Sequence, residues 1–153
     1  MLTIRIDDTE VKKKLDILKT GVKNFKKPLK VIGNKFLKIY SEDVFRTQGG
    51  AIGDKWKKLS PATLLMRRKR VGYYAQTPKT TSKKLVWTGK LQGGFNKTVT
   101  KTRLVINNTV DYFKYHQRST GRPPQRKMLG LTKKIVTIVI EEFNKYIKNL
   151  IKK

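Results

Sequence analysis

Two segments carry large apolar side chains at helical spacing, and they limit where the 153-residue chain can build a core. The first covers residues 28–48 and the second covers residues 132–152. Apolar residues that recur every three or four positions line one face of a helix, and another element has to cover that face. The pattern therefore predicts two long amphipathic helices that supply most of the buried surface.

The ends of both helices carry residues that start or stop helices. Pro28 suits a first helical position, where its missing N–H costs nothing, and Gly49 and Gly50 suit a helix end. Thr132 can cap the second helix with its side-chain oxygen. The apolar stripes are Leu29, Ile32, Phe36, Ile39 and Tyr40 in the first helix, and Ile135, Ile138, Val139, Phe143, Tyr146, Ile147 and Leu150 in the second.

Three segments favour β structure. Residues 2–6 alternate apolar and polar side chains, which suits a half-buried strand. Residues 95–100 and 103–108 are rich in Thr, Val and Ile around a short polar link, which indicates an antiparallel hairpin. We therefore expect an α+β fold in one domain, residues 1–153, with a small antiparallel β-sheet packed against the two long helices.

A further helix is predicted just after the first strand. Asp7 and Glu10 suit its start, because acidic groups favour the positive end of a helix. Four residues keep one of its faces apolar: Val11, Leu15, Leu18 and Val22.

Residues 49–92 hold glycines, prolines and basic clusters around few large apolar residues, so a long irregular loop is expected there. Within it, Ser60 and Pro61 indicate an N-cap and a first-turn proline that start a short helix through about Arg70. Residues 71–84 have little to bury, and we predict that they form a flexible loop.

The chain holds 37 Lys and Arg against 10 Asp and Glu, a formal net charge of +27, which predicts an anionic partner. Nucleic acid and acidic proteins both satisfy such a field. The densest basic run is Arg67, Arg68, Lys69 and Arg70. Followed by Tyr73 and Tyr74, this run could contact phosphates and stack on bases, or it could be a solvated helix end, and both interpretations stay open.

The residues that carry enzyme chemistry are few. There is no cysteine and one histidine, His116, whose nearest acidic neighbour in sequence is Asp111, whereas a catalytic zinc site needs about three ligands. We expect no catalytic residues, no metal and no cofactor. No apolar run is long enough to cross a membrane and no signal peptide is evident, so we expect cytoplasmic synthesis and no membrane partner.

Five short motifs follow one another through the middle of the chain. In order they are Gly53, Trp56, Leu59, Ser60 and Thr63; Leu85, Thr88, Gly89 and Leu91; Tyr112, His116 and Gln117; Gly121; and Pro124, Arg126, Leu129 and Gly130. In this order and with these gaps, the motifs resemble the phage virion morphogenesis family, the Mu-like tail completion proteins, over roughly residues 49–130.

The motif residues also have a physical interpretation. Trp56 and Leu59 can anchor an irregular loop by inserting into the core. Gly89 allows a tight turn before Leu91. Arg126, in a proline-led loop, could clamp a carboxylate or a helix end, either within the subunit or across a subunit interface.

The resemblance implies a non-enzymatic structural protein of the virion neck, assembled in the host cytoplasm. It would complete the tail and join it to the capsid as a ring around the DNA path, expected to be a hexamer. Its partners would be other neck, portal-side and tail proteins, with non-specific contact to genomic DNA. The alternative is a free-standing basic nucleic-acid-binding protein. Candidate motif and interface residues are Trp56, Leu59, Ser60, Thr88, Gly89, Leu91, Tyr112, His116, Pro124 and Arg126.

Overall fold

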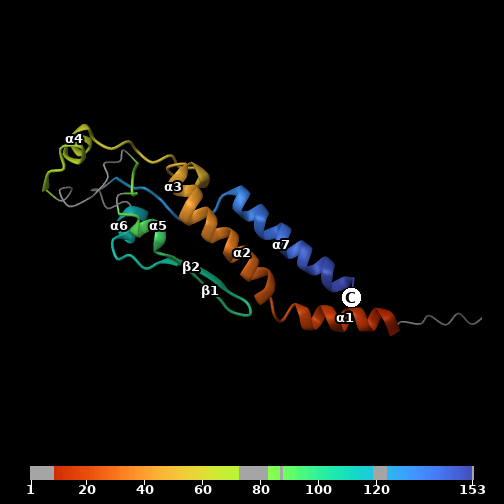
Figure 1. Ribbon diagram of the computed structural model, residues 1–153. Coiled ribbons are helices and arrows are strands. Elements are labelled where there is room, and N and C mark those ends of the chain that lie inside the picture. The colour runs from red at the N-terminus through yellow and green to blue at the C-terminus, as the bar shows by residue number, and fades with distance from the viewer. Residues whose placement is uncertain (1–8, 73–82, 87, 119–123, 153) are drawn as a thin grey trace, which may run out of the picture.

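The computed structural model describes residues 9–72, 83–86, 88–118 and 124–152, and it has the predicted α+β architecture (Figure 1). The elements in chain order are α1 (Thr9–Gly21), α2 (Lys26–Lys38), the π-helical turn η1 (Ile39–Asp43), α3 (Val44–Arg46), the 3₁₀ turn η2 (Gly50–Ile52), α4 (Pro61–Lys69), α5 (Lys90–Gly93), β1 (Phe95–Val99), β2 (Leu104–Asn108), α6 (Phe113–Gln117) and α7 (Lys133–Ile151). The predicted strand at residues 2–6 and most of the predicted flexible loop, residues 73–82, lie outside the described residues.

The first long helix is confirmed as a rod made of α2, η1 and α3, which follow one another without a break from Lys26 to Arg46. It begins two residues before Pro28, so the prediction that Pro28 takes the first helical position is wrong. Pro28 still lies in the first turn, where amide groups have no partner within the helix. The Asn24 side chain accepts a hydrogen bond from the Lys26 amide at 3.1 Å and so helps to start the rod.

The predicted hairpin is also confirmed. Strands β1 and β2 pair antiparallel, with Phe95 opposite Asn108 and Val99 opposite Leu104. Alternate side chains of both strands are at least half-buried, and those between them are exposed. One face of this two-stranded sheet therefore packs against the core, beside α2.

Helix α7 is the second predicted long helix, and it lies alongside α2 (Figure 1). Thr132 caps it as expected, by accepting a hydrogen bond from the Ile135 amide at 3.3 Å. Lys35 of α2 pairs with Glu142 of α7 at 2.8 Å. Ile135 is buried, whereas Val136 and Ile140 remain exposed, so the described residues cover α7 along one side.

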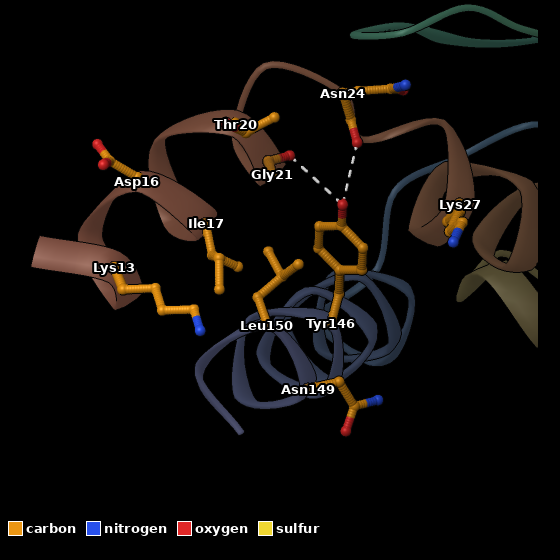
Figure 2. Close-up of a pocket in the computed structure, with 10 residues that line it drawn as sticks. All are labelled: Lys13, Asp16, Ile17, Thr20, Gly21, Asn24, Lys27, Tyr146, Asn149 and Leu150. Carbon is orange, nitrogen blue, oxygen red and sulfur yellow. Dashed lines mark hydrogen bonds between the residues drawn. The ribbon is translucent and has the colours of Figure 1, made fainter. Parts of the chain in front are cut away.

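Helix α1 meets the rest of the molecule at the C-terminal end of α7 (Figure 2). The Tyr146 hydroxyl donates to the carbonyl groups of Gly21, at 3.4 Å, and Asn24, at 3.1 Å. A hollow of about 1010 Å³ remains between the two helices. The apolar face predicted for α1 is largely uncovered, since Leu15 is 57% exposed and Val22 is 47% exposed. The reason is that α1 crosses only the end of α7.

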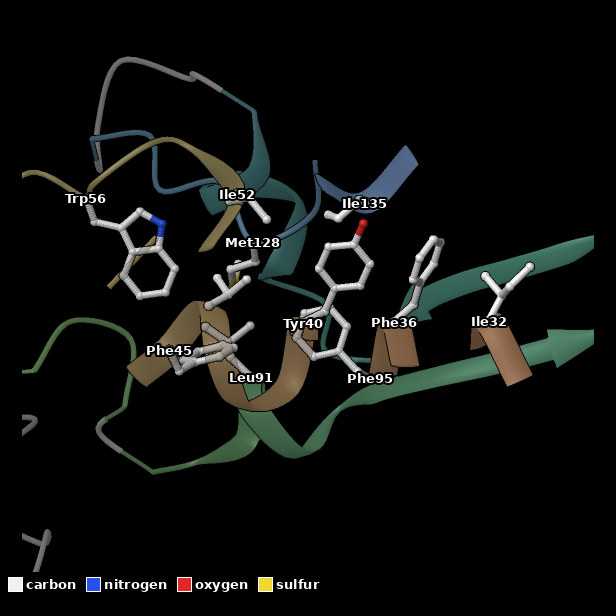
Figure 3. Packing of buried hydrophobic residues seen from close by; sticks show 11 residues of the cluster. Ile32, Phe36, Tyr40, Phe45, Ile52, Trp56, Leu91, Phe95, Met128 and Ile135 are labelled. Carbon is white, nitrogen blue, oxygen red and sulfur yellow. The ribbon is translucent and has the colours of Figure 1, made fainter. Parts of the chain in front are cut away.

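The core gathers side chains from most elements around the rod (Figure 3). The Tyr40 ring stacks on Phe95 with 6.3 Å between ring centroids, and Phe45 meets Trp56 edge to face at 5.5 Å. Edge-to-face and offset aromatic pairs are the favoured arrangements in protein interiors. The remaining members of the cluster are Ile32, Phe36, Val44, Ile52, Leu91, Met128 and Ile135.

Candidate functional site

The last predicted motif forms an extended stretch that crosses the molecule before α7, and we call residues 124–130 the anchored segment. Two side chains from elsewhere in the chain bind its backbone carbonyls. The Trp56 indole donates to the Lys127 carbonyl at 2.6 Å, and the Tyr40 hydroxyl donates to the Gly130 carbonyl at 2.9 Å. The pKa of Tyr40 is raised, mainly because the side chain is buried; the bond to Gly130 lowers the pKa by a smaller amount.

Gln117 at the end of α6 fixes the middle of the anchored segment. Its side-chain oxygen accepts hydrogen bonds from the amides of Met128, at 2.9 Å, and Leu129, at 3.0 Å. Its side-chain nitrogen donates to the Leu129 carbonyl at 2.7 Å. One amide side chain therefore satisfies three backbone groups of a stretch that has no regular structure.

Trp56 lies in the core because the chain before it makes a tight turn at Gly49. Gly49 has φ +94°, and its amide donates to the Val44 carbonyl at 2.8 Å, which ends the rod. A Cβ there would overlap the Asp54 carbonyl oxygen and come within 2.6 Å of the Trp56 ring. Only glycine fits this approach, and it brings Trp56 onto Phe45.

The residues after Trp56 follow the predicted local structure in part. Ser60 caps α4, since its side-chain oxygen accepts a hydrogen bond from the Thr63 amide at 3.2 Å. Leu59 is half-buried and is not part of the core cluster among the described residues, so the loop is anchored by Trp56. In the next motif, Gly89 has φ +74° just before α5, which agrees with the predicted tight turn. Leu91 is buried and Thr88 is exposed.

Arg126 points into the protein and is 6% exposed. It donates to the Lys57 carbonyl, at 3.4 Å, and its Nε has no partner among the described residues. Burial and the nearby charge of Arg67 lower its pKa. Arg126 therefore bonds to a loop carbonyl within the chain. The predicted clamp on a carboxylate or a helix end is not seen among the described residues.

His116 is half-buried beside Arg126, whose amide donates to the His116 carbonyl at 2.9 Å. Burial and the Arg126 charge both lower the pKa of His116, which favours the neutral imidazole at pH 7. The Tyr112 ring lies 6.3 Å from the imidazole ring and is exposed, and so is Pro124. Tyr112 and Pro124 are thus surface residues, whereas His116 and Arg126 belong to the interior.

The basic run divides in the same way. Arg67 is 7% exposed and donates to the Lys83 carbonyl at 3.1 Å. Its guanidinium therefore faces the interior, which contradicts the expectation that it contacts phosphates. Arg68, Lys69 and Arg70 are exposed at the end of α4. Tyr73 and Tyr74 lie outside the described residues.

Within the described part of the chain, no group of three or more His, Cys, Asp or Glu side chains could hold a metal ion. The acidic side chains that form ion pairs there bind basic neighbours, as in Asp43 with Arg46 at 2.7 Å and Asp54 with Lys127 at 3.5 Å. The bond from Lys35 lowers the pKa of Glu142. No described helix is long and apolar enough to cross a bilayer.

Two residues that complete this site were missed as candidate site residues from the sequence. Gln117 was noted only as part of a motif, and Gln48 was not noted at all. The Gln48 side chain accepts from the Lys84 amide at 2.7 Å and donates to the Phe45 carbonyl at 2.7 Å. The signal for Gln117 is that it directly follows His116 in the third motif, whereas nothing in the sequence marks Gln48.

The motifs thus meet around the anchored segment: Trp56, His116, Gln117 and Arg126 bond to or within it. A search of protein-family models, curated proteins and solved structures found no match to this chain.

Proposed function

We propose that this chain is a non-enzymatic structural subunit of the phage neck, which completes the tail and joins it to the capsid as part of a ring around the DNA path. The observation that carries the proposal is the convergence of three motif residues, Trp56, His116 and Gln117, on one anchored segment. Trp56 and Gln117 hold the backbone of residues 127–129, and Arg126 reaches back to Lys57. These bonds support a structural use of the ordered motifs, because they hold backbone groups of the chain together.

The charge of the chain supports a place beside a polyanion. Six copies in a ring would bring six times the +27 charge to the DNA path. Arg68, Lys69 and Arg70 are exposed and close together at one helix end, where they can contact phosphates or acidic neighbours. Acidic partners in the neck would use the same field.

The alternative is a free-standing nucleic-acid-binding protein, and the exposed part of the basic run is the observation that favours it. The two proposals differ in how binding depends on salt. A monomer built to bind nucleic acid gives tight binding to duplex DNA with a steep salt dependence. A neck subunit gives weak binding in solution and enters particles.

Electron microscopy of phage particles made without this protein tests the proposal. We expect filled heads and tails that remain separate, and joined particles when the wild-type chain is supplied again. Joined, infectious particles formed in its absence would reject the neck function. Particles that lack packaged DNA but carry tails would favour a role in nucleic-acid handling instead.

A further inference from the structure

The outer edge of β2 lies beside an apolar groove of about 330 Å³. Phe36 and Tyr40 of the rod line one side of the groove, and Leu104 and Ile106 of β2 line the other. Leu131, at its mouth, is 80% exposed although it is a large apolar residue. The groove therefore offers an uncovered apolar surface along a strand edge.

The backbone of β2 is also unpaired on this side among the described residues. Hydrogen bonds from Thr100 to Arg103 and from Thr109 to Gly94, both at 2.9 Å, flank the ladder between β1 and β2. Bonded and non-bonded residue pairs alternate along such a ladder, so the peptide groups of Leu104 and Ile106 point away from β1. An edge of this kind can accept another strand.

The chain contains a segment whose side chains fit this edge. Residues 2–6 place three apolar side chains on one side and two polar side chains on the other, because strand residues alternate between faces. The apolar set is Leu2, Ile4 and Ile6, and the polar set is Thr3 and Arg5. Paired with β2, the apolar set would cover the groove and the polar set would face water.

Charge selects the direction of pairing. If Ile6 lies opposite Leu104 in an antiparallel arrangement, Asp7 and Asp8 come next to the hairpin turn, which carries exposed Lys101 and Arg103. Opposite charges at neighbouring strand positions stabilise a sheet. A parallel arrangement would remove the acids from these cations.

The segment cannot reach the sheet of its own copy. The Phe25 amide donates to the Lys101 carbonyl at 2.7 Å, which places the end of α1 near the hairpin turn. From there α1 runs away from the hairpin (Figure 1) for its 13 residues, about 18 Å at 1.5 Å per residue. Asp7 and Asp8 can span only about 7 Å of the way back.

We infer that residues 2–6 of one copy add to β2 of a neighbouring copy as an antiparallel third strand that covers the groove at Leu131. This contact presupposes the proposed function, in which copies of the chain assemble into a ring, and it is the contact that would join neighbouring copies. Each copy gives a strand and receives one, so the contact is head-to-tail and can close into a ring.

Disulfide trapping tests the contact, because the chain has no cysteine of its own. A double variant, Ile4→Cys with Ile106→Cys, is oxidised and resolved on a denaturing gel without reductant. Facing positions on paired strands lie within disulfide range, so we expect covalent dimers and higher oligomers. The two single variants, mixed before oxidation, should give a covalent dimer.

A matched control uses Thr3→Cys with Ile106→Cys, whose thiols would lie on opposite faces of the added strand, and it should stay monomeric. A link that closes within one chain, or no link in the double variant, overturns the inference. The result is separable from the proposed function: rings or particles that form without the trapped link reject the strand contact alone.

A second measurement follows self-association of the cysteine-free chain by light scattering. Ile4→Asp should weaken it at least about tenfold, because a buried aliphatic side chain is replaced by a charge. Arg5→Gln, on the polar face, should change it less than about threefold. Equal effects of the two substitutions would contradict the inferred register.

Discussion

The anchored segment and helix α1 are attached to the molecule in opposite ways. Residues 124–130 have no regular structure, yet side chains from three other elements or loops of the chain bind their backbone. Helix α1 is regular, but it leaves Leu15 and Val22 exposed and borders a hollow of about 1010 Å³. Regular secondary structure and firm attachment are therefore separate properties in this chain.

This difference in attachment suggests that folding depends on residues around the anchored segment, whereas assembly depends on residues of α1 and α7. Around the anchored segment, the side chains of Tyr40, Trp56 and Gln117 bind backbone groups of the chain, so substitutions there should act on the free energy of unfolding. At α1 and α7, apolar side chains such as Ile140 and Ile151 stay exposed. Substitutions there should leave folding almost unchanged.

The largest expected effect is that of Gly49→Ala, at the turn that brings Trp56 to the anchored segment. The new Cβ would overlap the Asp54 carbonyl, which is backbone, and press on Trp56 at 2.6 Å. Positive φ adds about 1–3 kcal/mol of strain, so we expect a total loss of about 4 kcal/mol or more, measured by urea unfolding. The control is Gly53→Ala, with φ +93° and no atom within 4 Å of the new Cβ, which should cost about 1–2 kcal/mol. Equal losses would show that the close approach at Gly49 is unimportant.

The next effect in size is that of Gln117→Ala, which tests whether one side chain holds the anchored segment. It leaves the amides of Met128 and Leu129 and one carbonyl without partners. Unsatisfied groups cost about 1–3 kcal/mol each when buried, and partial access of water reduces the sum, so we expect a loss of about 2–3 kcal/mol in thermal or urea unfolding. Gln125→Ala, in the same segment, removes one exposed bond to the Gln117 carbonyl and should change stability by less than about 0.5 kcal/mol.

The two regions also differ in what the sequence could predict. The rod, the hairpin and α7 follow from local periodicity, and so does the Ser60 cap, because each depends on residues a few positions apart. The bonds of Trp56 to Lys127 and of Tyr40 to Gly130 join positions 71 and 90 residues apart. No local pattern predicts such long-range bonds. The order of the motifs therefore indicated that residues 49–130 matter, but it did not predict which of them bond to one another.

For helix α1 the local structure was predictable from the sequence, but its burial was not. Its periodicity correctly predicted a helix, but an apolar face does not state whether anything covers it. Likewise, the run from Arg67 to Arg70 predicted one basic surface, whereas burial of Arg67 removes its guanidinium from it. Burial depends on tertiary contacts, and a single sequence does not give them.

Lowering the pH should reduce the free energy of unfolding through protonation of His116, which lies beside the anchored segment. Burial and the Arg126 charge lower its pKa below the ordinary 6.5, so protonation favours the unfolded chain. This contribution to stability is complete above about pH 6.5 and falls as the pH drops below that value, by at most about 1.4 kcal/mol per pH unit for one proton. Urea unfolding at pH 7.5 and 5.8 measures it, and His116→Gln should flatten the difference. An unchanged pH dependence in that variant would exclude His116 as its source.

The smallest expected effect on folding is that of Leu15→Ser on α1. Leu15 is 57% exposed, so its substitution removes little buried surface and should change the free energy of unfolding by less than about 0.5 kcal/mol. The same kind of substitution at a buried position of the rod, Ile32→Ser, should cost about 3 kcal/mol or more, because Ile32 is 1% exposed. Urea unfolding of both variants measures the contrast. A loss above about 1.5 kcal/mol for Leu15→Ser would mean that α1 is covered in the isolated chain, and the distinction between the two regions would no longer hold.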